Sequence, residues 1–274
     1  MKRLLYATDL NAHSDRALHR AMMLAIAQDA ELKIIHASTA PSSDTKARVT
    51  ELDAQIRNSE LPGLSVVQKA ELNYNIDVLE GDPIDQLART VAGFEPDLVI
   101  MGPSSDVSAM NLFYGTSVDQ AVARISSPIL VVKARPYAHY RNALIAFDHT
   151  LGARRALELS TVLAPRASLT LVCAAGQDQS AAELANTRDM VTGHVGLILD
   201  AAFEGQHKDV DVDIMVKSGN VGDALLGAAR EVTPDLYAFG RTQKSGLKSL
   251  LPGSTASLLL GHVTCDALIA GQTP

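Results

Sequence analysis

Residues 96–120 read PDLVIMGPSSDVSAMNLFYGTSVDQ, and residues 234–258 read PDLYAFGRTQKSGLKSLLPGSTASL. Five residues recur at a displacement of 138 positions, namely Pro96/Pro234, Asp97/Asp235, Leu98/Leu236, Gly102/Gly240 and Gly115/Gly253. Each stretch is an apolar run, a glycine, a polar loop, a second glycine and a helix-forming segment. A strand that leads through glycine into a helix N-terminus is a common anion site, because loop N–H groups and the helix dipole both point toward the ligand. The stretch therefore predicts an α/β fold built twice.

The repeat extends outward from these loops over the whole chain. Short apolar runs at 4–8 and 144–147 are followed by Asp9 and Asp148, and further apolar runs begin at Leu32 and Leu169. Amphipathic helical patterns separate these runs, and the final apolar runs lie at 129–132 and 267–270. The displacement drifts only between 137 and 139 positions, which is what small loop insertions produce in an old duplication.

Nearly continuous apolar strands that alternate with amphipathic helices predict a parallel sheet covered on both faces. The predicted fold class is α/β, with two tandem doubly wound parallel five-stranded sheets, each a Rossmann-like α/β/α sandwich. The predicted domains are residues 1–136 and 139–274, joined by a short linker within 135–141. Such sheets bind ligands beyond the carboxyl ends of their strands, where the winding reverses.

The composition narrows the classes of function. With 47% hydrophobic and 20% charged residues, the chain is expected to form ordinary packed cores. A net charge of −7 argues against a nucleic-acid surface. Asp9 interrupts the first apolar run and no run approaches the roughly 20 residues of a membrane span, so we expect no membrane association and a cytoplasmic location. Cys173 and Cys265 lie in apolar runs and are expected to be buried thiols, with a disulfide as the alternative.

Several chemical motifs are missing from the sequence. It contains neither a P-loop nor the dinucleotide fingerprint, and its eight histidines show no metal-binding spacing. We therefore predict no metal site and no catalytic residues. Ser245 and Lys248 match the spelling of a Ser-x-x-Lys acyl-transfer motif, but no supporting motif accompanies them.

The two glycine loops and the aspartates at the strand ends resemble the universal stress protein family in its tandem two-domain form. ATP-binding members of that family carry Gly, two residues, Gly, nine residues, then Gly followed by Ser or Thr. The spacing is kept in both halves, with Ser105 and Gln243 at the second glycine position. The resemblance implies a stress-response binding or regulatory protein whose ligand is ATP or a related adenine nucleotide.

The resemblance also implies site residues, with the adenine between the first two strand ends and the phosphates along the glycine loop. In the second half these are Ala146, Asp148, Ala174, Gly240, Arg241, Gln243, Lys244, Gly253, Ser254 and Thr255. In the first half they are Ala7, Asp9, Ala37, Gly102, Ser105, Gly115, Thr116 and Ser117. We favour the second half, because its loop carries Arg241, Lys244 and Lys248, which suit phosphate oxygens. The first loop carries Asp106 and no cation.

Structural explanations of the same residues remain open. Gly102 and Gly240 are also what a turn with positive φ requires. Asp9 and Asp148 are also typical of residues that close a turn or cap a helix, and Thr116 and Ser254 are typical N-caps.

Partners and alternative functions follow from the repeat. An apolar final strand in each half is an association hazard unless it is paired. We therefore predict an intramolecular pseudo-dimer of the two halves, and a homodimer of the whole chain is a further option. The alternative functions are a nucleotide-independent interaction protein in which both sites are degenerate, and a slow ATPase.

Overall fold

A computed structural model describes residues 1–11, 15–40, 43–58, 65, 68, 70–103, 116–203, 210–241 and 255–271. The chain divides into two units, Met1–His139 and Tyr140–Pro274, and each is described by itself.

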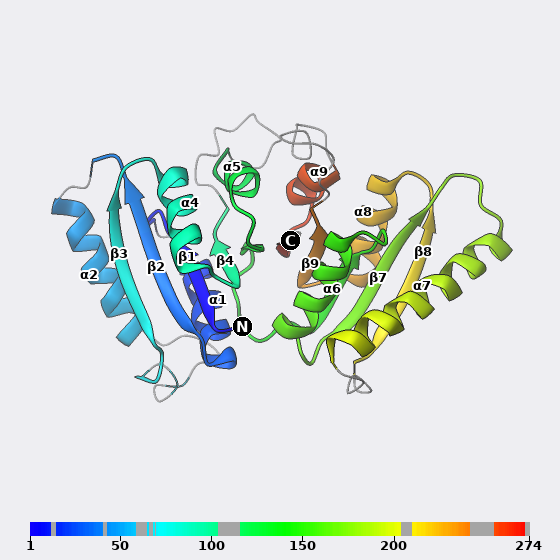
Figure 1. Cartoon of the computed structure of the whole chain (residues 1–274), viewed down its shortest axis with the longest axis horizontal. Helices are drawn as coiled ribbons and strands as arrows, with labels where there is room; N and C mark the ends of the chain where they lie inside the picture. The colour runs from blue at the N-terminus through cyan, green and yellow to red at the C-terminus, as the bar shows by residue number, and fades with distance from the viewer. Residues whose placement is uncertain are drawn as a thin grey trace. The chain divides into compact units, whose positions relative to one another are not determined.

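Strands and helices alternate in the first unit (Figure 1). Its described strands are β1 (Arg3–Ala7), β2 (Glu31–Ser38), β3 (Tyr74–Glu80), β4 (Leu98–Met101) and β5 (Ile129–Val131). The helices that connect them include α1 (Asp15–Gln28), α2 (Ser43–Asn58), α4 (Pro83–Phe94) and α5 (Thr116–Arg124).

The second unit repeats this order. Its described strands are β6 (Asn142–Ala146), β7 (Ser168–Ala175), β8 (Val212–Ser218), β9 (Leu236–Gly240) and β10 (Asp266–Ala270). Its helices are α6 (Leu151–Leu163), α7 (Ala181–Ala202), α8 (Val221–Val232) and α9 (Thr255–His262).

Both sheets are parallel and doubly wound. The strand order is β3-β2-β1-β4-β5 in the first unit and β8-β7-β6-β9-β10 in the second. Leu4 of β1 pairs with Leu32 of β2 on one side and with Leu98 of β4 on the other, so the winding reverses between β1 and β4. In the second unit it reverses between β6 and β9. The predicted fold class is therefore confirmed.

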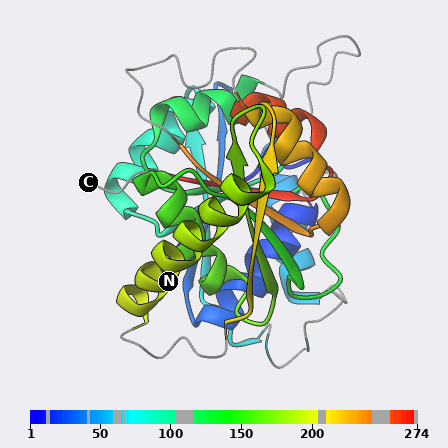
Figure 2. The ribbon, with the colours of Figure 1, turned by 90° about the vertical axis from the view of Figure 1, so that its right-hand side faces the viewer.

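Helices cover both faces of each sheet. Because parallel crossovers are right-handed, α1 and α2 fall on one face of the first sheet and α4 and α5 on the other. Figure 1 shows α2 and α4 on opposite sides of β2 and β3. In the second unit, α6 contacts α7 on one face and α8 contacts α9 on the other, and Figure 2 shows α7 alongside β8.

The repeated Pro-Asp-Leu segment anchors the amino end of the central strand in each unit. Oδ2 of Asp97 accepts hydrogen bonds from the backbone N–H groups of Lys2 and Arg3, the latter at 3.0 Å. The carboxylate of Asp235 accepts from Arg141 N–H at 2.8 Å and Asn142 N–H at 3.0 Å. The motif therefore has a structural role at the sheet edge opposite the carboxyl ends of the strands.

The backbone conformation explains a second pair of repeated glycines, Gly81 and Gly219. Gly81 has φ +136° and Gly219 has φ +118°, a region that favours glycine strongly. Each precedes a helix N-cap, Asp82 for α4 and Asn220 for α8, whose side chain accepts from the backbone of the first turn. These turns bring each helix back onto its sheet.

Apolar strands and helix faces form the cores, as the pattern predicts. Cys173 and Cys265 are buried, free thiols, in agreement with the predicted burial. None of the helices in the described ranges is long and apolar enough to cross a membrane.

Candidate functional site

A cavity of about 270 Å³ lies at the carboxyl ends of the first unit's strands, where the winding reverses. Its walls come from the ends of β1, β2 and β4 and from α4 and α5. The lining residues are Ala7, Thr8, Asp9, Ile35, His36, Ala37, Pro83, Ile84, Leu87, Met101, Gly102, Pro103 and Ser117. This is the position at which open parallel sheets bind ligands.

Hydrogen bonds fix the polar groups at the β1 end of this cavity. The backbone N–H of Thr8 donates to Ile35 O at 2.9 Å, and the His36 ring lies with Nδ1 at 3.0 Å from Thr8 O. Oδ1 of Asp9 accepts from the backbone N–H of Asn11 at 3.0 Å, and Oδ2 accepts from the Asn11 side-chain amide at 3.0 Å. Asp9 thus closes a turn, as one of the open explanations predicted, while its side chain also lines the cavity.

Gly102 presents bare backbone to the cavity. A Cβ atom built at Gly102 would have no heavy atom of the described residues within 4 Å, and its φ lies outside the positive range. The explanation that Gly102 serves a positive-φ turn is therefore wrong. Backbone without a side chain allows a ligand to approach closely.

The structure brings together most of the predicted first-half residues that it describes. Ala7, Asp9, Ala37, Gly102 and Ser117 all line the cavity. Ser105 and Gly115 lie outside the described residues, and Thr116 is the first residue of α5, described only in its backbone.

The predicted second-half residues occupy the corresponding strand ends. Ala146 ends β6, Ala174 lies near the end of β7, and Gly240 ends β9. Oδ1 of Asp148 accepts from the N–H of Thr150 at 3.2 Å and from its hydroxyl at 2.6 Å, so Asp148 closes a turn before α6. Gln243, Lys244, Gly253 and Ser254 lie outside the described residues, and Thr255 begins α9 with only its backbone described.

The sequence that forms this fold and cavity matches a known family. The sequence model of the universal stress protein family matches residues 1–133 and again residues 139–271. The chain belongs to the universal stress protein family. No match was found among curated protein sequences.

Two solved structures that span nearly the whole chain agree with this assignment at the level of the fold. A universal stress protein from Archaeoglobus fulgidus DSM 4304 is similar at 13% identity over 99% of this chain and 98% of its own, with a TM-score of 0.72. A functionally unknown protein from Pseudomonas aeruginosa PAO1 is similar at 14% identity over 99% of this chain and 93% of its own, with a TM-score of 0.70. An Arabidopsis thaliana family member solved with AMP aligns at 16% identity over 48% of this chain and 92% of its own, with a TM-score of 0.33.

In this universal stress protein, Gly240 has a packing role that its repeat partner Gly102 lacks. A Cβ at Gly240 would clash with the backbone of Gly152 and Ala153 at the start of α6, with Gly152 Cα at 2.7 Å. A Cβ at Gly152 would in turn meet Gly240 Cα at 3.0 Å. The explanation that Gly240 serves a positive-φ turn is also wrong, because close approach of α6 to β9 is the reason for glycine here.

Burial shifts the pKa of two side chains in the second unit, Arg241 and Cys173. Burial lowers the pKa of the half-buried Arg241 guanidinium. Burial, followed by the charge of Asp148, raises the pKa of the Cys173 thiol. The Asp148 charge therefore acts on Cys173 at the carboxyl end of β7, where His36 stands in the first unit.

Three aromatic rings at the end of β6 were not predicted from the sequence. The Phe147 ring packs edge-on against His149 and His194, with centroids 5.1 and 5.7 Å away. The two histidine rings are parallel at 5.1 Å, and their Nδ1 atoms are 2.8 Å apart, within hydrogen-bond distance. His194 comes from α7, so no local pattern could have paired it with His149. Within the described ranges, no three His, Cys, Asp or Glu side chains gather into a metal-binding group.

Proposed function

We propose that this universal stress protein is a stress-response regulatory protein that binds an adenine nucleotide. The observation that carries the proposal is the cavity at the winding reversal of the first unit, which gathers Ala7, Asp9, Ala37 and Gly102. Ligand sites on open parallel sheets are concave, largely apolar and supplied with few polar groups.

The lining of that cavity suits a base with an attached ribose. Ile35, Ile84 and Leu87 offer aliphatic surface for a planar ring, and the small side chain of Ala37 leaves room for it. A carboxylate such as Asp9 accepts hydrogen bonds from ribose hydroxyls. Gly102 allows a ligand to lie against the backbone of the loop that follows β4.

We further propose that the second unit binds the nucleotide more tightly than the first. The sequence after Gly240 supplies Arg241, Lys244 and Lys248, whereas the loop after Gly102 supplies Asp106. Charge-assisted hydrogen bonds to phosphate are about twice as strong as neutral ones. The charge difference favours the second unit as the principal nucleotide site, whereas the observed cavity favours the first. Both sites are therefore tested in one experiment.

The test is a calorimetric titration of the full chain with ATP and with AMP. The matched variants are Ala174→Phe and Ala37→Phe, which place a phenyl ring at repeat-equivalent, partly exposed positions beside the two proposed adenine sites. We expect Ala174→Phe to weaken ATP binding at least tenfold and Ala37→Phe to remove only a weaker component. The reverse order would make the first unit the principal site. If wild type gives no heat of nucleotide binding, the nucleotide-independent interaction protein is the remaining function. Release of phosphate from ATP would identify an ATPase.

We also propose that the two units associate through their edge strands. Within its own unit β5 pairs only with β4, and β10 pairs only with β9, and both strands are apolar. Unpaired apolar edges favour association. For one globule of this length, small-angle scattering is expected to give a radius of gyration of about 19 Å. Two separate maxima in the pair-distance distribution, as for two bodies apart, would refute the pseudo-dimer. A molecular mass twice that of the chain would indicate a homodimer.

A further inference from the structure

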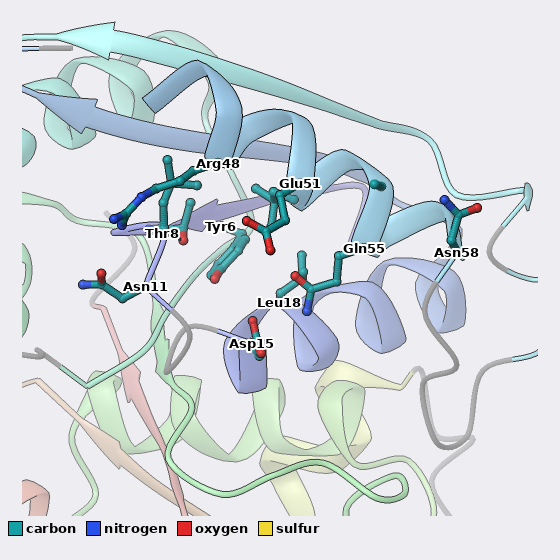
Figure 3. A pocket seen from close by; sticks show the side chains of 12 residues that line it. Tyr6, Thr8, Asn11, Asp15, Leu18, Arg48, Glu51, Gln55 and Asn58 are labelled. Atoms are coloured by element: carbon teal, nitrogen blue, oxygen red, sulfur yellow. Dashed lines mark hydrogen bonds between the residues drawn. The ribbon is translucent and has the colours of Figure 1, made fainter. Parts of the chain in front are cut away.

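A larger cavity of about 600 Å³ lies on the other face of the first sheet, between α1 and α2 (Figure 3). Its walls include Tyr6 and Thr8 of the β1 segment, Asp15 and Leu18 of α1, and Glu51 and Leu52 of α2. The cavity shares Thr8 with the proposed nucleotide cavity, and none of its other lining residues belongs to that site. The proposed nucleotide site therefore does not account for this space.

The charges around the cavity are mostly negative. Figure 3 shows Asp15 and Glu51 on the two helices that face each other across the cavity. Neither carboxylate has a hydrogen bond or ion pair to any residue in the described parts of the chain. Arg48 is the one cation among the described lining residues, and its Nε lies 2.9 Å from Oδ2 of Asp44. Asp15 and Glu51 are both exposed, so two carboxylates without a partner among the described residues stand at the rim of the cavity, which favours a cationic ligand and disfavours an anion.

The helix dipole stabilises the charge of Asp15 but not that of Glu51. Asp15 stands in the first turn of α1, where the helix dipole favours a negative charge. Glu51 lies in the middle of α2 and has no such compensation. An ammonium group near Glu51 would supply a positive charge and three hydrogen-bond donors.

The remaining lining is apolar or neutral and extends along α2. Leu18 and Leu52 are buried and supply aliphatic surface. Asn58 lies ten residues beyond Arg48 on the same helix, which is roughly 15 Å at the α-helical rise. Thr8 is 8% exposed, and its hydroxyl accepts a hydrogen bond from Leu10 N–H at 3.0 Å. Its hydroxyl proton has no acceptor within the described chain, so this end of the cavity retains a polar group for a ligand.

The second unit closes the corresponding position. At a displacement of 139, Thr8 corresponds to Phe147, Leu10 to His149 and Asp15 to Arg154. Phe147 and His149 pack with His194 of α7, and Arg154 Nε lies 2.8 Å from Glu158 Oε1. Rings and a paired arginine thus stand where the first unit has an open cavity and a carboxylate. The cavity is therefore a feature that distinguishes the two repeats.

We infer that the cavity between α1 and α2 binds an aliphatic diamine or polyamine. One ammonium group is held by the carboxylates of Asp15 and Glu51, and the methylene chain lies against Leu18 and Leu52. An elongated cavity with aliphatic walls and a negative rim matches a flexible chain that carries separated positive charges. The inference does not depend on nucleotide binding.

The test is a calorimetric titration of the full chain with spermidine and with 1,4-diaminobutane at low salt. We expect saturable 1:1 binding that Glu51→Gln and Asp15→Asn each weaken at least tenfold. The matched control is Asp189→Asn, which removes an exposed carboxylate from α7 and should leave the affinity unchanged. Ala54→Trp is expected to abolish binding without a change of charge, because Ala54 lines the cavity. Thermal unfolding of each variant establishes that it is folded.

Several outcomes would overturn the inference. Equal binding of the neutral butane-1,4-diol would show that the carboxylates do not select the ligand. Equal weakening by Asp189→Asn would show that the polyamine senses only the net charge. Displacement of spermidine by stoichiometric Mg²⁺ would show that the carboxylates hold a metal ion in place of an organic cation. Unchanged affinity in the Asp15→Asn, Glu51→Gln double variant would place the amine elsewhere.

Discussion

Substitution of Gly240 by alanine tests the close approach of α6 to the end of β9 in the second unit. The added methyl group would clash with the backbone of Gly152 and Ala153, so α6 or the end of β9 has to shift. Overpacking of this kind costs roughly 1–3 kcal/mol. Alanine also restricts the unfolded chain, which returns about 0.4–1 kcal/mol. We expect a net loss of about 1–2 kcal/mol in the free energy of unfolding.

Gly102→Ala is the matched control, because it makes the same change at the repeat-equivalent position. Among the residues that the structure describes, a Cβ at Gly102 meets no heavy atom within 4 Å, so we expect only the effect on the unfolded chain. We expect Gly102→Ala to be neutral or to stabilise by up to about 1 kcal/mol. For a unit of this size, 1 kcal/mol corresponds to a shift of roughly 3–5 °C in Tm.

Urea and thermal unfolding, followed by circular dichroism, measure both variants against wild type. The reasoning predicts a lower midpoint for Gly240→Ala and an unchanged or higher one for Gly102→Ala. Equal stability of wild type and Gly240→Ala would refute the packing role of Gly240. A loss confined to Gly102→Ala would refute the assignment of open space to the first unit.

Two further predictions concern buried or bonded carboxylates. Burial alone would raise the pKa of Asp97, but hydrogen bonds from the N–H groups of Lys2 and Arg3 lower it overall. Its stabilisation is therefore present above about pH 4 and is lost as pH falls through the lowered pKa. Asp97→Asn should cost about 1–2 kcal/mol at pH 7, and this difference should shrink in urea titrations as the pH falls below about 4; a difference that stays constant over that range would contradict the charge argument. Tyr140→Phe removes the 2.6 Å hydrogen bond to the buried Oδ2 of Asp266 and should cost about 1–3 kcal/mol, whereas wild-type stability would show that other donors replace the hydroxyl.

The sequence by itself determined the architecture. Hydrophobic periodicity and the repeated prolines and glycines are local signals, and they predicted alternating strands and helices in two copies. The strand order comes from the structure, and right-handed crossovers then fix which face of the sheet each helix covers. The same signals placed Asp9 and Gly102 at strand ends, and the family resemblance implied Ala7 and Ala37 beside them. The structure brings all four into one cavity.

Only the tertiary structure decided how equivalent residues differ between the two units. Gly102 and Gly240 have the same place in the repeat, yet Gly240 contacts Gly152, a residue 88 positions earlier, and Gly102 has no comparable contact in the described part of its unit. The cavity between α1 and α2 and the three rings at the end of β6 likewise depend on side chains that come from different elements. Such contacts are set by how closely two elements pack and by the side-chain volumes between them. A repeat pattern fixes which element comes next, but it does not fix the space that remains between elements.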